Sequence, residues 1–533
     1  MAKEILLGDE AVALGAVHAG LSAGYSYPGT PATEVMEYLI RVSKGGSLFT
    51  AAWSVNEKTA FEEALGTSFA GKRALVSMKH VGLNVAADPF MSASLTGANG
   101  GFVVVAADDP SMHSSQNEQD SRFFAQFAQI PCFEPADHQE AYDLTREAYD
   151  LSENMRIPVM LRLTTRLSHS RGGVETREPR PKNSLKPGAR ECWTLLPTNA
   201  RVLFKKVLDQ QAAFVRHSET TPFNRLEMNS GGRTLGIIAS GIGYNYVMEN
   251  LRGAASPPPV LKISAYPLPE SLIRRLVEHV GTVLVVEEGY PLIERAVKGM
   301  FGIHGKTVLG RLSGDLPLAG ELTPETVRAA LHEPPRERQA LADFKLAGRP
   351  PQLCVGCPHA DTLKALNDAL DGVETATVFS DIGCYTLGWF PPYSAVDTCV
   401  CMGASVGMAK GAAEAGIHPA VAVIGDSTFG HSGITPLLSA AAFNTNMVLI
   451  VLDNGTVAMT GGQPSFATGE RLLRIIEGVG VAKDHIRVIT PLPKFHAQNV
   501  RTLKDEIAYP GLSVIVAVRE CLEEAKKKNR RAE

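Results

Sequence analysis

Short apolar runs bounded by turn residues recur along the first third of the chain. They cover residues 72–78, 100–110 and 157–166. Continuous apolar runs of this length are typical of parallel strands that are buried on both faces. Between residues 24 and 42, a turn rich in proline and glycine leads into an amphipathic stretch that is typical of a helix. The pattern therefore predicts alternating strands and helices.

The same pattern returns twice, after two polar breaks. Residues 168–230 are polar and rich in proline, and residues 331–352 form a second break of the same kind. Three successive blocks of alternating strands and helices predict an α/β protein with three doubly wound domains. The expected divisions are a first domain over 1–190, a linker over 191–230, a middle domain over 231–335 and a last domain over 345–533.

The composition is that of an ordinary globular protein. Of 533 residues, 44% are apolar and 20% are charged, and the formal net charge is −4. This charge, without any basic stripe, gives no indication of nucleic-acid binding. No apolar run reaches the roughly 18 residues of a membrane span, and the first residues lack the pattern of a secretory leader, so we expect a cytoplasmic protein. In that reducing compartment the eight cysteines are expected to be metal ligands or core residues.

Asp426 and Asn454 each follow an apolar run directly, 28 residues apart. Strand ends of an open α/β sheet meet at one edge, where ligands bind. With the carbonyl of Thr456, these side chains form a set of hard oxygen ligands suited to Mg²⁺. Gly425 and Ser427 leave room and amide donors for a pyrophosphate. The pattern is the diphosphate-binding motif of thiamine diphosphate enzymes, although two strand-end turn residues can produce it by themselves.

A thiamine diphosphate enzyme also needs a carboxylate that faces N1′ of the aminopyrimidine. That contact stabilises the imino form, whose nitrogen removes the reactive proton of the cofactor. Glu57, Glu62 and Glu63 are the candidates in the first block. Glu57 comes first, after a short extended run, and the residues after it are typical of a helix. Each of the three glutamates can alternatively lie on a solvated helix face.

Seven motifs occur in a fixed order over nearly the whole chain: YPGTPATE, WSVNEKTAFEEALG, MKHVGLNVAADP, DDPSMHSSQNEQDSR, CVGCPH, DIGCYTLG and GDSTFGHSGI. Together they resemble the thiamine-diphosphate (alpha) subunit of indolepyruvate:ferredoxin oxidoreductase, within the 2-oxoacid:ferredoxin oxidoreductase family. The resemblance implies that the first domain binds the pyrimidine and the last domain binds the diphosphate. The cofactor is then expected to span both domains, across a dimer interface.

The resemblance also implies roles for individual residues. Glu57 is the expected partner of N1′, and Thr30 lies beside the reacting carbon. The residues expected to bind the cofactor are Glu57, Asp381, Gly383, Gly403, Gly425, Asp426, Ser427, Asn454 and Thr456. Of these, the expected Mg²⁺ ligands are Asp426, Asn454 and Thr456.

The wider family holds a [4Fe-4S] cluster beside the thiamine, and this chain has a cysteine at each of its four ligand places. These are Cys354, Cys357, Cys384 and Cys521. Four thiolates are what such a cluster requires. A structural zinc on the same ligands and four unconnected thiols are the alternatives. The remaining cysteines are expected to be packing residues, namely Cys132, Cys192, Cys399 and Cys401.

Two features depart from the family pattern. Many relatives continue into a ferredoxin-like domain with further cysteine runs, and this chain is expected to lack it, so that electrons would leave directly from one cluster. Within residues 460–466, relatives commonly carry histidine at the position of Gly462, which leaves the substrate preference open.

Loop residues that follow the predicted strands of the first block are candidates for substrate contacts. They are Lys79, His80, Ser115, Gln116 and Asn117. Such polar groups could bind a substrate carboxylate or the pyrimidine, or they could make only local turn hydrogen bonds.

The expected function is the oxidative decarboxylation of arylpyruvates, such as indolepyruvate, to arylacetyl-CoA. The expected cofactors are thiamine diphosphate, Mg²⁺ and one [4Fe-4S] cluster, with coenzyme A as co-substrate and ferredoxin or a similar protein as electron acceptor. The substrate class comes from the resemblance, while the residues themselves support a thiamine-dependent 2-oxoacid enzyme. Relatives need a smaller beta subunit, so we expect an α₂β₂ complex. A non-redox thiamine-dependent lyase and a catalytically silent scaffold subunit are the alternatives.

Overall fold

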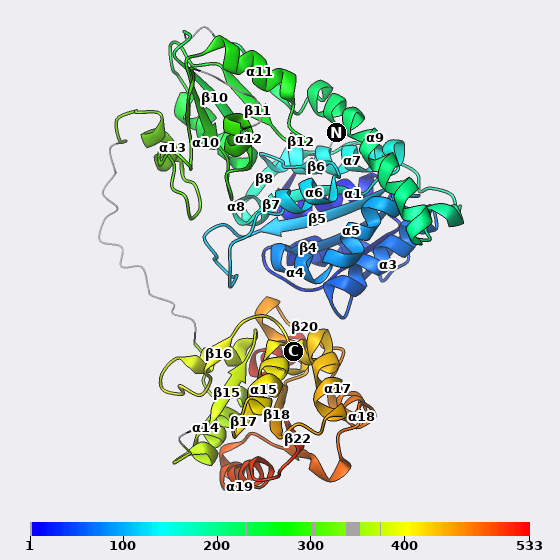
Figure 1. Ribbon diagram of the computed structural model, residues 1–533, viewed down its shortest axis with the longest axis vertical. Helices are drawn as coiled ribbons and strands as arrows, with labels where there is room; N and C mark the ends of the chain where they lie inside the picture. The colour runs from blue at the N-terminus through cyan, green and yellow to red at the C-terminus, as the bar shows by residue number, and fades with distance from the viewer. Residues whose placement is uncertain (1–2, 230–231, 300–304, 337–351, 374, 533) are drawn as a thin grey trace. The chain divides into compact units, whose positions relative to one another are not determined.

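The computed structural model describes residues 3–229, 232–299, 305–336, 352–373 and 375–532 (Figure 1). The chain divides into two compact units, residues 1–340 and residues 341–533. Each unit has its own sheets and cores, and each is described here by itself. Both are built from parallel sheets with covering helices, as the sequence predicts.

The first unit is built around a seven-stranded sheet with the order β12-β6-β7-β5-β4-β2-β3. All neighbouring strands run parallel except β12, which pairs antiparallel with β6. The strands are β2 (Ala23–Ser26), β3 (Thr50–Trp53), β4 (Ala74–Lys79), β5 (Phe102–Asp108), β6 (Cys132–Phe133), β7 (Val159–Thr164) and β12 (Ala265–Tyr266).

Helices cover both faces of this sheet (Figure 1). Val103 and Val105 of β5 belong to the core cluster that contains the helices of one face, whereas Val104 belongs to the core of the other face. This alternation follows from the period of two in a strand. The helices are α1 (Gly8–His18), α2 (Thr33–Val42), α3 (Glu57–Phe69), α4 (His80–Val85), α5 (Ala87–Thr96), α6 (Arg122–Ala128), α7 (His138–Met155) and α8 (Thr165–His169). A short antiparallel ribbon joins β1 (Lys3–Leu7) to β8 (Arg171–Glu175).

A second sheet of the same unit has the order β14-β13-β10-β11-β9. Only β9 pairs antiparallel with its neighbour. The strands are β9 (Arg225–Glu227), β10 (Leu235–Ser240), β11 (Val260–Ile263), β13 (Thr282–Val286) and β14 (Thr307–Leu309). The accompanying helices are α10 (Gly241–Leu251), α11 (Glu270–His279), α12 (Leu292–Gly299) and α13 (Pro324–Ala330).

The segment expected as a linker, 191–230, holds the 24-residue helix α9 (Pro197–Thr220). Its buried residues Leu203, Val207 and Phe214 follow a helical spacing, and Val207 and Phe214 join a core cluster of the first unit. Charged residues between them, such as Lys205 and Lys206, dilute this apolar stripe in the sequence. The segment is therefore a packed element and not a free connection. Residues 337–351, which include the start expected for the last domain, lie outside the described residues.

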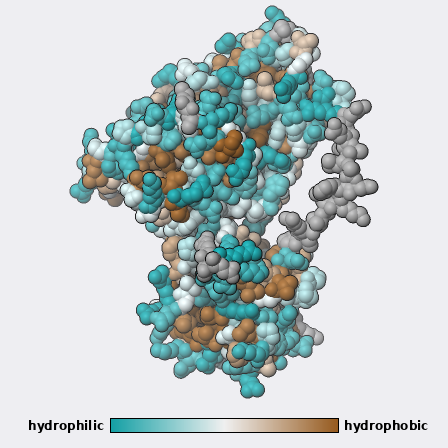
Figure 2. Space-filling view, turned by 180° about the vertical axis from the view of Figure 1, so that it is seen from behind, coloured by the Kyte–Doolittle hydropathy of each residue, from teal (hydrophilic) through white to brown (hydrophobic). Residues whose placement is uncertain are grey.

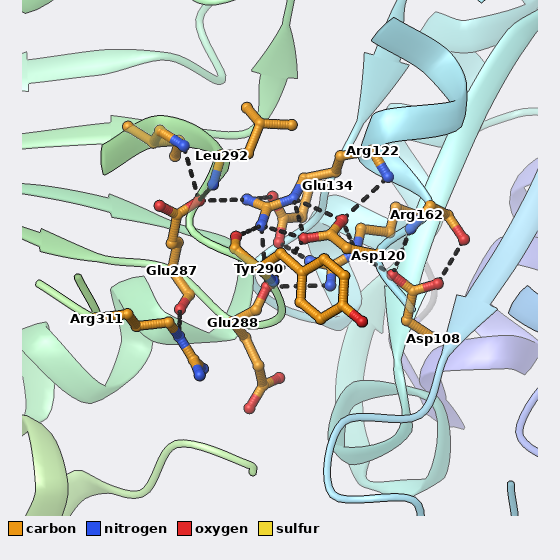
Figure 3. A network of polar contacts seen from close by, with 12 residues as sticks. Asp108, Asp120, Arg122, Glu134, Arg162, Glu287, Glu288, Tyr290, Leu292 and Arg311 are labelled. Atoms are coloured by element: carbon orange, nitrogen blue, oxygen red, sulfur yellow. Dashed lines mark hydrogen bonds and ion pairs between the residues drawn. The ribbon is translucent and has the colours of Figure 1, made fainter. Parts of the chain in front are cut away.

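A buried network of charged side chains connects the two sheets of the first unit (Figure 3). Arg162 on β7 bonds Asp108 at 2.6 Å and also pairs with Glu134. Arg122 on α6 pairs with Asp120, and at 3.0 Å with Glu287, which directly follows β13. These side chains are at most 3% exposed, so the charges between the two sheets are buried away from bulk solvent.

The second unit contains a six-stranded parallel sheet with the order β16-β15-β17-β18-β22-β21. The strands are β15 (Thr377–Ser380), β16 (Thr398–Cys399), β17 (Ala420–Gly425), β18 (Met447–Asp453), β21 (Ile486–Ile489) and β22 (Leu512–Val518). The helices are α14 (Pro358–Leu370), α15 (Ala404–Glu414), α16 (Asp426–Thr428), α17 (Ile434–Ala442), α18 (Gly469–Gly478), α19 (His496–Ile507) and α20 (Leu522–Ala532). A small ribbon pairs β19 (Thr456–Val457) with β20 (Gln463–Pro464).

The surface is mostly hydrophilic, with separate apolar patches on the face seen in Figure 2. The large apolar side chains that reach the surface include Phe127, Phe443 and Val355. Within the described part of the chain, no helix is both long and apolar enough to cross a membrane.

Candidate functional site

Glu57 is the first residue of α3, four positions after Trp53, the last residue of β3. The side chain of Asn56 caps this helix by accepting a hydrogen bond of 2.8 Å from the Thr59 amide. The Glu57 side chain is buried, and Gly82 of α4 lies against it. A Cβ atom on Gly82 would lie 2.5 Å from Glu57 Oε1. Any residue other than glycine at this position would therefore displace the carboxylate.

Thr30 and Asp109 lie in neighbouring loops that follow β2 and β5. Ser114 joins the two, since its hydroxyl donates to the Thr30 carbonyl at 3.1 Å and its amide donates to Asp109 Oδ2 at 2.8 Å. Lys79, the last residue of β4, donates from Nζ to the Ser114 carbonyl at 3.2 Å. Burial lowers the pKa of Lys79, against the opposing effect of the Asp109 and Glu57 carboxylates nearby. The structure thus gathers these groups at the carboxyl edge of the first sheet.

Besides Lys79, the four other residues expected near the substrate differ in their surroundings. His80 is 1% exposed, its Nε2 bonds the Asn117 carbonyl at 3.0 Å, and its buried Nδ1 has no hydrogen-bond partner in the protein. The Ser115 hydroxyl is used within the loop, because it donates to Asp109 at 2.7 Å. The side chains of Gln116 and Asn117 are exposed. Of this set, His80 alone keeps a buried polar atom for a ligand.

In the second unit, Asp426 and Asn454 follow the adjacent parallel strands β17 and β18. The Gly455 amide donates to Asp426 Oδ2 at 3.2 Å, and the Thr456 amide donates to Asn454 Oδ1 at 3.0 Å. Burial raises the pKa of Asp426 to about 7, and the Asp453 carboxylate adds to this effect. A carboxylate, an amide oxygen and a nearby carbonyl therefore lie at one strand edge, which fits a hard divalent cation.

Asp381, after β15, is held by two residues that the sequence analysis did not single out. The hydroxyls of Tyr385 and Ser405 donate to its two carboxylate oxygens, the second at 2.6 Å. Burial raises the pKa of Asp381 to about 6. Tyr385 directly follows Cys384 in the DIGCYTLG motif. This position next to a motif cysteine is the feature of the sequence that could have indicated a role for Tyr385.

Three glycines expected to bind the cofactor lie in tight places. Cβ atoms on Gly383 and Gly425 would lie 2.2 Å and 2.9 Å from the Tyr385 ring. Gly403 has φ +85°, and its Cβ would lie 2.6 Å from Ser432. Side chains at these positions would therefore close the space along the carboxyl edge of the sheet, beside Asp381 and Asp426.

Four cysteines from three separate parts of the sequence line one cavity of about 120 Å³ in the second unit. They are Cys354, Cys357, Cys384 and Cys521, and the same cavity is lined by Asn454 and Thr456. Burial raises the pKa of Cys384 to about 12, and Cys357, Cys521 and Cys354 add to the shift. Among the described residues, no three or more His, Cys, Asp or Glu side chains are arranged to hold a metal ion as they stand. The thiols thus surround a space and do not converge on one point.

His359 lies between this cavity and the strand edge. It is the second residue of α14, two positions after Cys357, and it is 4% exposed. Its Nε2 accepts a hydrogen bond of 3.1 Å from Asn454 Nδ2. Burial lowers the pKa of His359 to about 4, which keeps the ring neutral at neutral pH.

The other cysteines lie outside the cavity. Cys132 is buried in the first unit, and Cys192 is partly buried there. Cys399 and Cys401 are exposed, and Cys399 Sγ lies 4.0 Å from Thr386 Oγ1.

Two family models match the chain. Residues 14–220 match "Pyruvate flavodoxin/ferredoxin oxidoreductase, thiamine diP-bdg", and residues 381–514 match "Thiamine pyrophosphate enzyme, C-terminal TPP binding domain". The indolepyruvate oxidoreductase subunit IorA of Archaeoglobus fulgidus is 41% identical over 97% of this chain and 86% of the relative. The chain belongs to the IorA family. The Pyrococcus abyssi member is 37% identical over 97% of this chain and 85% of its own length.

The IorA family lies within the 2-oxoacid:ferredoxin oxidoreductases, so the chain is an alpha subunit of such an enzyme and binds thiamine diphosphate. A solved 2-oxoglutarate:ferredoxin oxidoreductase from Magnetococcus marinus has the same fold, with a TM-score of 0.50 at 18% identity. That similarity covers 62% of this chain and 65% of the other. The reaction class is the thiamine-dependent oxidative decarboxylation of a 2-oxoacid, and the expected fold class is confirmed.

Proposed function

We propose that this IorA-family chain takes arylpyruvates as its 2-oxoacids and passes the electrons through one [4Fe-4S] cluster. One observation carries this proposal. Cysteines separated by up to 167 positions, from Cys354 to Cys521, line one cavity together with Asn454 and Thr456. The thiols therefore lie beside the strand edge that fits a divalent cation.

The residues present fit Mg²⁺ and the diphosphate of the cofactor. Asp426, the Asn454 amide oxygen and the Thr456 carbonyl would hold the cation, since all three are hard oxygen donors at the end of β17 and β18. Further cofactor contacts are proposed for Asp381, Gly383, Gly403, Gly425 and Ser427. When bound, the cofactor supplies a nucleophilic carbon and an electron sink.

Glu57 would share a proton with N1′ of the pyrimidine ring. Its position at the start of α3, buried and closed in by Gly82, holds the carboxylate in one place. A buried acid at a fixed position is what proton exchange with a ring nitrogen needs. Thr30 lies in the adjacent loop, tied through Ser114 to Asp109, and would lie beside the reacting carbon.

The Lys79 ammonium would bind the carboxylate of the 2-oxoacid. It extends from the end of β4 toward the loop of Ser114, close to Asp109 and Glu57. The buried Nδ1 of His80 supplies a further polar contact in the same loop region. Ser115 is already bonded to Asp109, so we assign it a structural role in the loop.

The size of the thiol cavity favours a cluster over a single zinc. A water needs only about 10–15 Å³ of such space, whereas this cavity measures about 120 Å³. Zinc draws its four ligands to about 2.3 Å from one point. A cubane instead occupies the centre and bonds one thiolate at each iron. Cys354 and its neighbour Val355, which is 98% exposed, lie at the surface, where electrons could leave to ferredoxin or a similar acceptor.

The arylpyruvate preference, the co-substrate and the partners are proposed from the relatives. Those relatives are named indolepyruvate oxidoreductase subunits, so a second, smaller subunit is proposed to complete an α₂β₂ enzyme. Coenzyme A would take the acyl group. The overall reaction then converts the 2-oxoacid anion and the coenzyme A thiol to acyl-CoA, CO₂ and one proton, with two electrons passed singly to two acceptor molecules.

The test is the iron and sulfide content of the chain after purification without air, with its visible spectrum. We expect about four irons per chain, lost in Cys384→Ser and retained in the control Cys192→Ser, which changes a thiol outside the cavity. With the second subunit present, acyl-CoA formation should be faster from indolepyruvate than from pyruvate.

Two results would contradict the proposal. A colourless protein with no iron, or with one zinc, would remove the electron-transfer route. Aldehyde release without any electron acceptor would then identify a non-redox lyase.

A further inference from the structure

We propose that His359 is a positioning residue that holds the Asn454 carboxamide with its oxygen toward the cation site. This inference rests on the proposed role of Asn454 as a cation ligand. The contact itself is in the structure, where Asn454 Nδ2 lies 3.1 Å from His359 Nε2 and both side chains are buried.

The hydrogen bonds determine which way the amide faces. The Thr456 backbone amide can only donate, and it lies 3.0 Å from Asn454, so the atom that faces it is the oxygen. The amide nitrogen must then face His359, and Nε2 of that ring must carry a lone pair to accept the bond. The oxygen has a second lone pair, which remains for a cation.

A flipped amide would be harmful on both sides. Its NH₂ group would face the Thr456 amide, donor against donor, and would also face the cation. Without an acceptor at position 359, the Asn454 nitrogen would lose the partner that opposes this rotation, and a buried donor would be left without its bond. The histidine therefore acts through Asn454, without touching the cation.

His359 is suited to this role because its own ring is fixed in position by its neighbours. It lies in the first turn of α14, and its ring packs edge-on against Tyr385 at a centroid distance of 6.0 Å. The Tyr385 hydroxyl in turn donates to Asp381. His359 also lines the cavity of the four cysteines, so one buried ring joins the thiol loop to the strand edge.

The experiment measures Mg²⁺ and thiamine diphosphate binding by circular dichroism or calorimetry, on the full chain purified without air. Mg²⁺ is titrated at a fixed concentration of thiamine diphosphate. We compare His359→Leu, which removes the acceptor, with His359→Gln, whose amide oxygen can accept from Asn454. His359→Leu should raise the Mg²⁺ concentration at half-saturation about 10-fold, and His359→Gln should recover most of the wild-type affinity.

Iron content and thermal unfolding are measured on the same samples, so that loss of the cluster or of the fold is seen separately. Wild-type affinity in a folded His359→Leu protein would overturn the proposal. So would equal weakening in both variants with normal iron, because that result indicates packing alone. If the wild-type protein binds no Mg²⁺ with thiamine diphosphate, the cation site of the proposed function fails, and the inference fails with it.

Discussion

At the scale of single residues, small side chains decide where the acidic groups can lie. Because Gly82 has no side chain, the Glu57 carboxylate can lie against it. In the same way, Gly425 leaves room for the Tyr385 ring, which lies beside Asp381. Of these residues, the sequence analysis singled out Glu57, Asp381 and Gly425, but not Gly82. The distances that make a methyl group intolerable come only from the folded chain.

Gly82→Ala should lower the turnover of the complete enzyme by about 10- to 100-fold, because a shift of about 1 Å in a catalytic group has costs of this order. The carboxylate would have to move, since the new Cβ would lie 2.5 Å from Glu57 Oε1. The assay is 2-oxoacid-dependent reduction of the acceptor. The matched control is Gly66→Ala in α3, where no atom beyond the helix's own nearby backbone lies within 4 Å of the new Cβ, and it should retain activity. Full activity in Gly82→Ala would mean that the Glu57 position is not critical.

Gly462, which the sequence analysis expected to depart from the family pattern, lies next to a side chain of α20. The glycine has φ +96°, and a Cβ there would lie 2.5 Å from Glu524 Oε2 on α20. A side chain in this place would be strained by the positive φ and would have to displace the end of the Glu524 side chain. The packing of α20 against this loop comes only from the folded chain.

At the scale of elements, buried polar side chains join strands and helices that the pattern predicts only one at a time. Glu506 of α19 accepts hydrogen bonds from His485 at 2.8 Å, from Arg487 of β21 at 2.6 Å and from Ser513 of β22 at 2.7 Å. Burial by itself would raise the pKa of Glu506, but the bonds from His485, Ser513 and Arg487 outweigh it and lower the pKa below 4.5. The carboxylate thus ties three elements together.

Glu506→Gln should destabilise the second unit by about 1.5–3 kcal/mol at neutral pH, the range for hydrogen bonds to charged groups. Because the folded pKa is depressed, this stabilisation is present above the unfolded value near 4.5 and is lost as pH falls through the folded pKa. The difference between wild type and variant should therefore shrink as the pH falls below about 4.5. Urea unfolding followed by Trp389 fluorescence measures it, since Trp389 is the tryptophan of residues 341–533.

Glu470→Gln is the control for this prediction. Glu470 pairs with Arg474 at 3.1 Å on the surface of α18, with both side chains about four-fifths exposed. Such pairs contribute little, so the change should be near zero at every pH. A Glu506 variant that behaves like this control would show that the three bonds do not stabilise the unit.

At the scale of the whole molecule, charged side chains are buried between the two sheets of the first unit (Figure 3). Arg162 bonds Asp108 and Glu134, and its guanidinium donates to the Glu288 carbonyl at 3.0 Å. Sequence patterns treat Arg162 as one polar residue within the apolar strand β7. Its partners come from segments up to 126 positions away.

Arg162→Met should destabilise this unit by about 3–5 kcal/mol, because the variant leaves buried carboxylates without their counter-charge. The measurement is urea unfolding followed by the fluorescence of Trp53 and Trp193. Arg166→Met is the control, since Arg166 is half-exposed and pairs with Glu321 near the surface. Similar stability of the two variants would contradict a structural role for the network.

The sequence by itself determined the classes of structure and chemistry. Local apolar runs predict buried parallel strands, and parallel strands place the residues that follow them at a common edge. That reasoning predicted Asp426 and Asn454 at adjacent strand ends, which the structure shows. It also paired the CVGCPH motif with two distant cysteines through the family resemblance, and all four line one cavity.

Only the tertiary structure decided the contacts between distant segments. Three examples are the hydrogen bond between Asn454 and His359, the hydrogen bond from Tyr385 to Asp381 and the ion pairs of Arg162. The spacing of residues along the sequence does not predict these contacts, because they form only when the chain folds. The helix α9 is another example. Charged residues interrupt its apolar face in the sequence, and only its packing against a core cluster of the first unit identifies that face. The physical reason is the same in each case: local periodicity shows which residues are buried, whereas the crossing of elements determines which buried residues meet.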